Sequence, residues 1–498
     1  MLGVMLGWPS ILPGQGAALT PQVVYEAQHD VSFTLRQMAP WAVLAEPKAS
    51  VSAWPAKGAN ASSRQPATTA GLNFDGIAAD AGWNTADTSG AVGATQYVQS
   101  VNTEIAVYDK TTGALLMDPM PMNTLWSGFG GVCETRNDGD PITQYDKAAG
   151  QWIISHHAVP NGGPYYQCVA LSTTSDATGS WYRYAFPLPG YFPDYPKLGV
   201  WPDAYYLTTN LLNQNAAYSN VGAYVCALDR SSMLVGAVAT SICFQTSSSY
   251  CVLLPSDLDG ATPPPTGSPN YFLGLGVNAL TLWKFHVDFT TPSNSTFTGP
   301  TTIPVPAFQK ICNGGQCIPQ QDTTNTVDGV GDRLMARVAY RNFGSYDALV
   351  TTHSIGGGAP YRSAIRWYDI HNPGGTPVVY RQGTFTPDSN YRWLGSIGMD
   401  KLEDIVVGYN VSSNALHPSI RYAGRMPSDP PGSLEPETSI VAGGGSQQSA
   451  NRAWNDVSSL SIDPADDCTF WYTSEYYKSD STDGWSTRIA SFKFTSCQ

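Results

Sequence analysis

Charged side chains recur at one position of a repeated sequence pattern. Each copy begins with a turn that carries a polar or charged residue and continues with a short apolar segment, a second turn and a second apolar segment. Two carboxyl groups can share the acid and base steps of glycosidic-bond hydrolysis, and guanidinium groups bind carboxylates through paired hydrogen bonds. If the copies are equivalent, one pocket collects the charged residues Asp87, Asp140, Asp203, Asp257, Arg333, Arg392, Arg452 and Asp456.

Four carboxyl groups are candidates for catalysis. Asp140 and Asp203 form the favoured pair, because a neighbouring proline fixes each of them in a tight turn. Asp456 is next, since nearby Arg452 would keep it ionised as a base or nucleophile. Glu475 lies among aromatic residues, where a raised pKa would suit a general acid. The alternative interpretation is that the aspartates only form turns and that Glu475 faces solvent.

Substrate binding would use arginines and tryptophans from the same repeated positions. Arg333, Arg392 and Arg452 are predicted to bind an acidic sugar or a group of hydroxyls. The indole rings of Trp201, Trp393 and Trp454 would stack on the apolar face of a sugar ring. The implied partner is an extracellular glycan.

One acidic turn is a candidate metal site. Asp257 and Asp259 could hold a structural Ca²⁺, although the turn lacks the complete EF-hand pattern. The sequence contains no Gly-x-Ser-x-Gly, no His-Glu-x-x-His and no phosphate-binding glycine loop. We expect no other cofactor.

The segments that carry these residues are predicted to be strands of a β-propeller. The copies lie roughly 60 residues apart, whereas propeller blades usually repeat after about 40 to 50, and they begin at Asp87, Asp140, Trp201, Cys251, Asp332, Tyr391 and Trp454. Their apolar segments are short, β-branched and bounded by Gly, Asp or Asn. We therefore predict an all-β fold, a seven-bladed β-propeller with loop insertions; six blades or two β-sandwich domains are the alternatives. Inner strands of a propeller line a central channel, so equivalent residues should meet at one end.

Composition agrees with this fold and excludes several classes of protein. Of the 498 residues only 13% are charged, and 48 glycines with 37 prolines make the chain rich in turns. A long-helix protein needs far more charge, and 42% hydrophobic residues are too many for global disorder. The net charge of -13 excludes the basic surface that nucleic acids require.

Three parts are predicted along the chain. Residues 1–21 combine an apolar run with small residues and resemble a degenerate export signal. Residues 22–72 would form an N-terminal extension with an Ala/Ser/Pro-rich linker, and residues 73–498 the propeller. No other stretch approaches the length of a membrane span. We therefore expect a secreted, extracellular protein without a membrane span.

The nine cysteines indicate disulfides, as in secreted proteins. Three predicted pairs close short loops: Cys312–Cys317, Cys243–Cys251 and Cys468–Cys497. Cys226, in an apolar stretch, is predicted to be a buried free thiol. The N-terminal strand would close the ring by pairing with the last blade, which Cys468–Cys497 would staple.

Two resemblances follow from particular motifs. Thr174-Ser-Asp-Ala-Thr-Gly-Ser-Trp181 resembles the Asp-box turn of sialidases, with its glycine displaced by one position, and Ser481–Thr487 is a poorer copy. Residues from about 73 onward resemble a group of secreted bacterial proteins of uncharacterised function, through segments such as 196–206, 391–397, 418–425 and 467–477. The first resemblance implies a propeller; the second implies no activity.

Together these features favour a secreted carbohydrate-active protein, most simply a sialidase-like glycoside hydrolase. The main alternative is a non-catalytic propeller that serves as an extracellular binding or surface-assembly module. The third is a uronate polysaccharide lyase, in which Arg neutralises the substrate carboxylate and Tyr or His is the base. Whether the chain is an enzyme is left open by the sequence.

Overall fold

The computed structural model describes residues 19–38, 67–79, 85–358 and 361–498, and these are almost entirely strands and turns. The helices among them are short, such as α2 (Gly131–Thr135) and α3 (Arg230–Met233). None of them is long and apolar enough to cross a membrane. The all-β prediction is confirmed.

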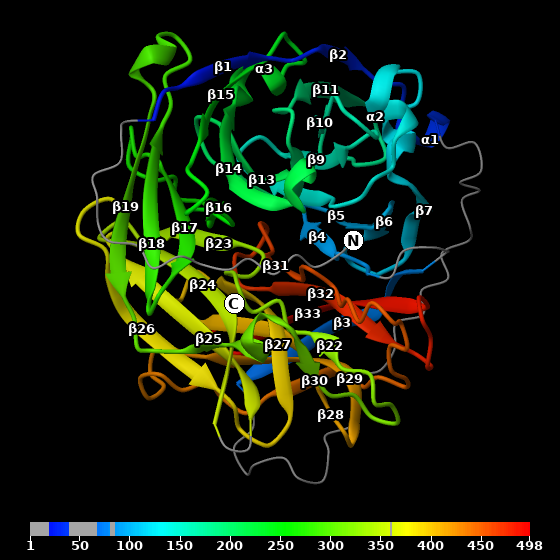
Figure 1. Cartoon of the computed structure of the whole chain (residues 1–498), viewed down its shortest axis with the longest axis vertical. Coiled ribbons are helices and arrows are strands. Elements are labelled where there is room, and N and C mark those ends of the chain that lie inside the picture. The colour runs from blue at the N-terminus through cyan, green and yellow to red at the C-terminus, as the bar shows by residue number, and fades with distance from the viewer. Residues whose placement is uncertain (1–18, 39–66, 80–84, 359–360) are drawn as a thin grey trace.

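Antiparallel meanders of four strands follow one another along the chain. The first three are β4 (Ser89–Val92), β5 (Gln96–Val101), β6 (Glu104–Asp109), β7 (Leu115–Pro121); β8 (Ile142–Asp146), β9 (Gln151–Ala158), β10 (Tyr166–Ser172), β11 (Trp181–Pro187); and β12 (Phe192–Val200), β13 (Tyr205–Asn213), β14 (Ser219–Leu228), β15 (Thr240–Gln245). Figure 1 places β4, β16, β23 and β31 near the middle of the molecule and β7, β19 and β26 at its rim. The fold is therefore propeller-like.

The later meanders repeat this arrangement, and a parallel pairing of β16 with β23 links two of them into one sheet. Their strands are β16 (Leu254–Asp259), β17 (Asn270–Gly276), β18 (Ala279–His286), β19 (Thr296–Pro304); β23 (Val338–Asn342), β24 (Asp347–Gly357), β25 (Arg362–His371), β26 (Val378–Phe385); β27 (Tyr391–Met399), β28 (Ile405–Ser413), β29 (Leu416–Arg425), β30 (Thr438–Val441); and β31 (Ser459–Ile462), β32 (Phe470–Tyr477), β33 (Trp485–Phe494).

The last meander takes its fourth strand from the N-terminal part of the chain. Strand β3 (Thr68–Ala78) runs antiparallel to β33, with Thr68 opposite Phe494, so the blue strand lies beside the red one in Figure 1. The Cys468–Cys497 disulfide lies at the ends of the same sheet. The predicted closure of the ring and its staple are confirmed.

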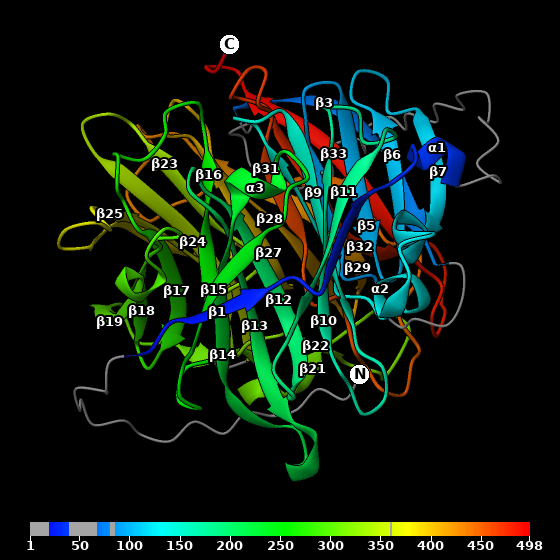
Figure 2. The same cartoon turned by 90° about the horizontal axis from the view of Figure 1, so that it is seen from above.

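The segment before β3 also joins the folded body. Strand β1 (Gln22–Tyr25) pairs with β15, and β2 (Gln28–Val31) pairs with β11, so one segment crosses the outer edges of two neighbouring meanders (Figure 2). These strands lie within the predicted extension. Most of the predicted export signal and of the linker lies outside the described residues.

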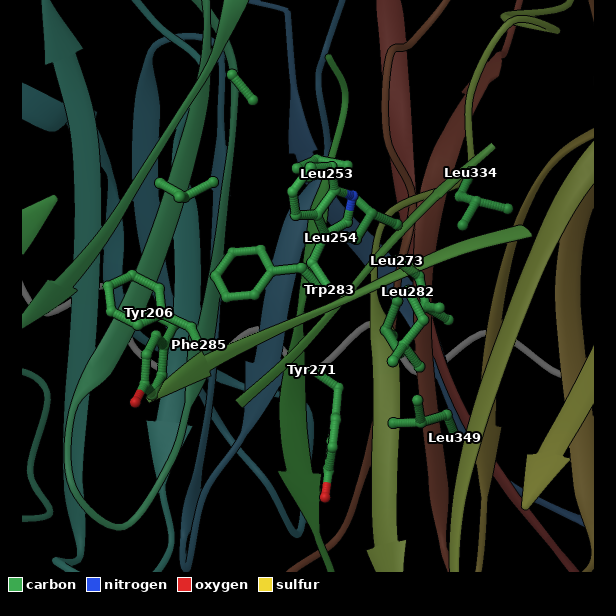
Figure 3. Packing of buried hydrophobic residues seen from close by; sticks show 14 of the residues in the cluster. Tyr206, Leu253, Leu254, Tyr271, Leu273, Leu282, Trp283, Phe285, Leu334 and Leu349 are labelled. Carbon is green, nitrogen blue, oxygen red and sulfur yellow. The ribbon is translucent and has the colours of Figure 1, made fainter. Parts of the chain in front are cut away.

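Large apolar side chains fill the spaces between neighbouring meanders. Figure 3 shows one such cluster, in which Tyr206 and Phe285 meet edge to face at 5.2 Å between ring centroids. Leu273 and Leu282 come from the same meander as Phe285, and Leu349 comes from the next one. This packing fixes the inner strands, which carry the site described below.

Six of the seven predicted copies begin at or just before the first strand of a meander. The third predicted copy is wrong. The first strand of the third meander is β12, whereas Trp201 and the residues after it form the turn between β12 and β13 and the strand β13. Strand β12 contains two prolines and a left-handed residue, Tyr195 with φ of 53°. Its sequence therefore lacks the run of β-branched residues from which the other strands were predicted.

Two of the three predicted disulfides form, Cys312–Cys317 and Cys468–Cys497. Cys226 is not free but bonds Cys243, because these residues are direct cross-strand partners on β14 and β15, with Cα atoms 4.1 Å apart. Cys251, the predicted partner of Cys243, carries the free thiol. A fourth bond, Cys133–Cys168, was not predicted.

Candidate functional site

Carboxyl groups from three meanders meet where their first strands begin. Asp87 precedes β4, Asp140 precedes β8 and Asp456 precedes β31, and together they line a small cavity with Tyr195 and Lys197 of β12. We call this the mouth cavity; its volume is about 20 Å³. Asp140 and Asp456 were predicted catalytic residues, and the structure brings them together.

Two further cavities continue along the inner strands. Lys197 also lines the middle cavity, of about 50 Å³, together with Ser89, Thr143 and Ser396. Arg337 lines both the middle cavity and a far cavity, which contains Lys147, Asp257 and Asp259. Neighbouring cavities share lining residues, so the three lie in a row along the inner strands. We call this row the channel, with the mouth cavity at one end and the far cavity at the other.

Hydrogen bonds tie the three carboxyl-bearing turns to one another. The Asn102 side-chain amide donates to the Asp87 carboxyl group, and its carbonyl oxygen accepts the Asp140 backbone N–H at 2.8 Å. The other Asp87 oxygen accepts the Asp456 backbone N–H at 2.8 Å. The Asp87 carboxyl group therefore holds the backbone of Asp456 in place, and this fixes the position of the Asp456 Cα.

Glycine is required beside this junction. Gly139 has φ of 96°, and a Cβ there would lie 2.5 Å from the Asn102 carbonyl oxygen. A side chain at this position would displace the amide that holds the Asp140 turn.

The backbone at the mouth adopts conformations that side chains usually avoid. The φ angles are 42° at Asp87, 53° at Asp140 and 53° at Tyr195. Such left-handed non-glycine residues cost on the order of 1 kcal/mol each and persist where surrounding contacts hold them. Here they lie at the starts of β4 and β8 and within β12, next to a register shift in β12.

Burial and mutual repulsion change the protonation of these acids. Burial, and then the negative charge of Asp456, raises the pKa of Asp87 to about 7. Burial raises the pKa of Asp140 well above its ordinary value, and the charges of Asp87, Asp194 and Asp456 add to the effect. Burial therefore favours the protonated forms of Asp87 and Asp140, and a protonated carboxyl group is what a general acid needs.

More charged residues surround the mouth cavity, and acids outnumber bases. Burial raises the pKa of Asp194 and raises that of Asp328 to about 6. Arg333 forms an ion pair with adjacent Asp332 at 2.7 Å, and its guanidinium carbon lies 4.5 Å from the centre of the Tyr195 ring. The predicted substrate-binding Arg333 is therefore close to the site but already neutralised.

Glu475 lies in β32, behind Asp87, and is fully buried. One of its oxygens accepts the Ala86 backbone N–H at 2.9 Å, and the other has no hydrogen-bond partner among the described residues. Burial raises its pKa well above the ordinary value. It supports the segment that carries Asp87, and its predicted role as a general acid stays untested.

Three predicted residues do not reach the mouth cavity. Asp203 lies in the β12–β13 turn, at the opposite end of β12 from Asp194, and accepts the Tyr206 hydroxyl at 3.2 Å. Arg392 is fully buried against Glu437, with both of its hydrogen bonds to that carboxylate at 2.9 Å. Arg452 contributes its backbone carbonyl, which accepts the Asp328 N–H at 3.1 Å.

The predicted stacking tryptophans are core residues. Trp201, Trp393 and Trp454 are at most 1% exposed. Trp201 packs edge-on against Tyr340 at 4.7 Å, and Trp393 and Trp454 pack against each other at 5.8 Å. Burying the large apolar area of these rings places them between meanders, so no ring face is available to a sugar.

Asp257 and Asp259 form an ion-pair network instead of a calcium site. Arg337 donates to both carboxylates at 2.6 Å, and the Lys147 ammonium lies 3.6 Å from Asp259. Basic groups therefore occupy the side from which a cation would bind. Within the described ranges no group of three or more His, Cys, Asp or Glu could hold a metal ion.

Several residues at the mouth were missed by the sequence analysis. Lys197, Asp194 and Tyr195 belong to β12, the strand that the repeat pattern misplaced. Asn102 lies in the β5–β6 turn, outside the repeated position, so nothing in its local sequence marks it. Asn455 precedes a predicted residue; it accepts the Thr88 backbone N–H at 2.9 Å.

The segment that resembles an Asp box forms the turn between β10 and β11. Asp176 accepts hydrogen bonds from the Thr178 N–H at 3.0 Å and from its hydroxyl at 2.7 Å. Trp181 is fully buried and donates to the Ala177 carbonyl at 3.1 Å. This turn joins outer strands and lies away from the channel.

The chain matches no protein-family model, and no curated protein matches it. Similar solved structures include a protein of unknown function from Dyadobacter fermentans, with 9% identity and a TM-score of 0.27 over 71% of this chain and 94% of that one. An α-L-arabinofuranosidase from Podospora anserina has 9% identity and a TM-score of 0.27, covering 60% and 90%. An exo-1,5-α-L-arabinanase from a bovine ruminal metagenomic library has 15% identity and a TM-score of 0.28, covering 59% and 95%. Likenesses at these TM-scores assign no activity to this chain.

Proposed function

We propose that this chain is an extracellular glycoside hydrolase whose active site is the mouth cavity of a seven-bladed β-propeller. The blade number rests on the meanders that begin with β4, β8, β12, β16, β23, β27 and β31 in the described part of the chain. An oxidising location is supported by four disulfides, which cytosolic proteins rarely keep.

The observation that carries the proposal is that Asp140 and Asp456, carboxyl groups from two different meanders, line one cavity at a channel end. Asp140 is the proposed acid: its pKa is raised by burial, and no described residue donates a hydrogen bond to its carboxyl group. Asp456 is the proposed base, because it lines the same cavity as Asp140 and its backbone N–H is fixed by the Asp87 carboxyl group at 2.8 Å.

The reaction would cleave the bond between the anomeric carbon and the glycosidic oxygen. Asp140 gives its proton to the departing oxygen, and a water molecule bonds to the anomeric carbon as it passes a proton to Asp456. One proton leaves the enzyme and one returns, so a proton transfer between the two carboxyl groups restores the starting state. Asp87 holds the Asp456 backbone during these steps.

The substrate would be a neutral sugar, not an acidic one. Arg333 is paired with Asp332, and Arg392 is paired with Glu437 and Asp388, so neither guanidinium is available for a sialate or uronate. The uronate lyase alternative needs an arginine that is free to bind the substrate carboxylate, and it is disfavoured because Arg333 and Arg392 are both paired. An arabinosyl or other uncharged polysaccharide fits the charge of the site better.

A non-catalytic binding module is the second candidate. It is favoured by the small enclosed volume of the mouth cavity, about 20 Å³, which is room for about one water molecule. It is also favoured by the buried tryptophans, which leave no stacking platform at these positions.

A product assay with purified protein separates these functions. The panel would contain arabinosyl, sialyl and uronic-acid polysaccharides, with reducing ends and the ultraviolet absorbance of unsaturated products as readouts. We expect reducing ends from a neutral glycan, no unsaturated product, and a loss of about 10²- to 10⁴-fold in Asp140→Asn and Asp456→Asn. Binding to a glycan without any product would instead identify the binding module. Asp203→Asn is the matched control, because Asp203 lies away from the mouth.

A further inference from the structure

Lys197 is a buried lysine that separates the mouth cavity from the rest of the channel. It lines both the mouth and the middle cavities and is 8% exposed. The register of β12 against β13 shifts between Asp194 and Lys197, and Tyr195 between them has φ of 53°. This irregularity gives Lys197 its place beside the three carboxyl-bearing turns.

The ammonium group of Lys197 is held in place from one side. It donates to the Pro196 carbonyl at 2.7 Å and lies 3.3 Å from the centre of the Tyr195 ring. The Tyr195 hydroxyl donates to the Leu334 carbonyl at 3.5 Å, which ties the ring to the segment before β23. A lysine ammonium has three N–H donors, so capacity remains for the carboxyl groups of the mouth.

Charged groups face Lys197 from every neighbouring turn. Carboxyl groups come from the segments before β4, β8 and β31 and from β12 itself, and a guanidinium group comes from the segment before β23; these groups are Asp87, Asp140, Asp456, Asp194 and Arg333. His157 of β9 is also within electrostatic reach and is buried. Arg333 is neutralised by Asp332, and among these residues Lys197 is the cation that lines the mouth cavity together with Asp87, Asp140 and Asp456.

We propose that Lys197 is a positioning residue that keeps the base carboxylate of the mouth charged while a neighbouring carboxyl group retains its proton. This inference rests on the proposed hydrolytic function and names a residue that controls its pH range. Lys197 acts through Asp140 and Asp456 and makes no bond to the reacting atoms.

The protonation of Lys197 sets the upper limit of this effect. Burial lowers its pKa to about 8, although Asp140 and Asp456 favour the charged form. Below pH 8 the ammonium therefore stabilises a negative carboxylate nearby. Without it, the carboxyl groups would repel one another unopposed and would ionise only at higher pH.

The test compares Lys197→Met with wild type in two readouts. In the first, selective ¹³Cγ-aspartate labelling follows the ionisation of the mouth carboxyl groups by NMR, with no substrate. In the second, the pH dependence of kcat/KM is measured on the best glycan of the panel. We expect both ionisation and the acidic limb of the profile to move up by about one pH unit in Lys197→Met, which is about tenfold in rate on that limb.

Matched variants decide what the shift means. Lys197→Arg keeps the charge and should restore the wild-type profile, and Lys147→Met removes a lysine from the far cavity and should leave the profile unchanged. Lys197→Gln, which keeps a hydrogen-bond donor for Pro196, replaces Lys197→Met if the latter does not fold. The proposal would be overturned if the carboxyl groups of Lys197→Met ionised within 0.3 pH unit of wild type, which is roughly a twofold change. An equal shift in Lys147→Met would also overturn it.

The two readouts separate the two proposals. A shifted NMR titration without any hydrolysis would reject the hydrolase and leave Lys197 as the group that sets the charge of the mouth. Hydrolysis with an unshifted titration would support the hydrolase and reject the role of Lys197.

Discussion

The two ends of the channel contain similar residues in different balance. At the far end, Asp257 and Asp259 share Arg337 in short ion pairs, and Lys147 lies beside Asp259. At the mouth, Asp87, Asp140 and Asp456 have one lysine among them. Each carboxylate is thus matched by a cation at the far end, whereas the mouth has an excess of acids.

Under the proposed function, this difference separates a structural end from a catalytic end. A buried carboxylate without a partner cation is costly, and paired charges avoid most of that cost. The far end follows this rule. The mouth departs from it in the same place where the backbone is strained, and such departures are typical of functional sites.

The largest expected effect separates activity from stability at the mouth. Asp456→Asn should reduce hydrolysis by about 10³-fold, because the base is lost. Its unfolding free energy should stay within about 1 kcal/mol of wild type, because the change removes charge repulsion and keeps the backbone bond to Asp87. Activity assays and urea unfolding at pH 7 check both parts. A large loss of stability would show that Asp456 is structural.

At the far end we expect the opposite result. Arg337→Met leaves Asp257 and Asp259 buried without their shared cation, so it should destabilise the fold by about 3 to 5 kcal/mol. Urea unfolding would measure the loss, and the folded fraction should retain hydrolytic activity. A stable Arg337→Met protein without activity would mean that the far end belongs to the site.

Asp87 at the mouth and Asp259 at the far end should also differ in the pH dependence of stability, whereas burial raises the pKa of Asp257. Asp87 has a raised pKa of about 7, so it binds a proton on folding, and its contribution to the unfolding free energy falls as pH rises from about 4 to 7. Burial opposes ionisation of Asp259, but Arg337 and Lys147 outweigh it and lower its pKa. The Asp259 contribution is therefore present at neutral pH and is lost as pH falls below about 4.

Urea unfolding between pH 3 and pH 8 tests this contrast. Asp87→Asn should flatten the decline between pH 4 and 7, by at most about 1.4 kcal/mol per pH unit for one proton. Asp259→Asn should weaken the loss below pH 4. Equal slopes in wild type and Asp87→Asn would show that Asp87 is ionised in the folded state.

The smallest expected effect concerns the outermost charge of the far end. The Lys147 ammonium lies 3.6 Å from Asp259, beyond a good hydrogen bond, and its side chain is 19% exposed. Lys147→Met should therefore cost less than about 1 kcal/mol. A larger loss in urea unfolding would place Lys147 on a par with Arg337.

The sequence predicted the β class, the ring closure and the shared location of Asp140 and Asp456. These depend on local features: short apolar segments bounded by turns predict strands, and an acid before a strand can be located by its position in the repeat. Asp140, Asp456 and Arg333 were found in this way, and they lie at or beside the mouth. Asp203 was misplaced because the prolines of β12 conceal a strand, which moved the third copy by one strand.

The tertiary structure alone decided where the side chains point and which residues they contact. Trp201, Trp393 and Trp454 have the residue type of a sugar platform, but their large apolar area is buried between meanders. Arg392 has the charge for an acidic sugar but pairs with Glu437, which comes from a later strand connection. Asn102 and Lys197 enter the site from a hairpin turn and an irregular strand. A sequence fixes residue types and local spacing, whereas burial and pairing depend on which distant segments the ring brings together.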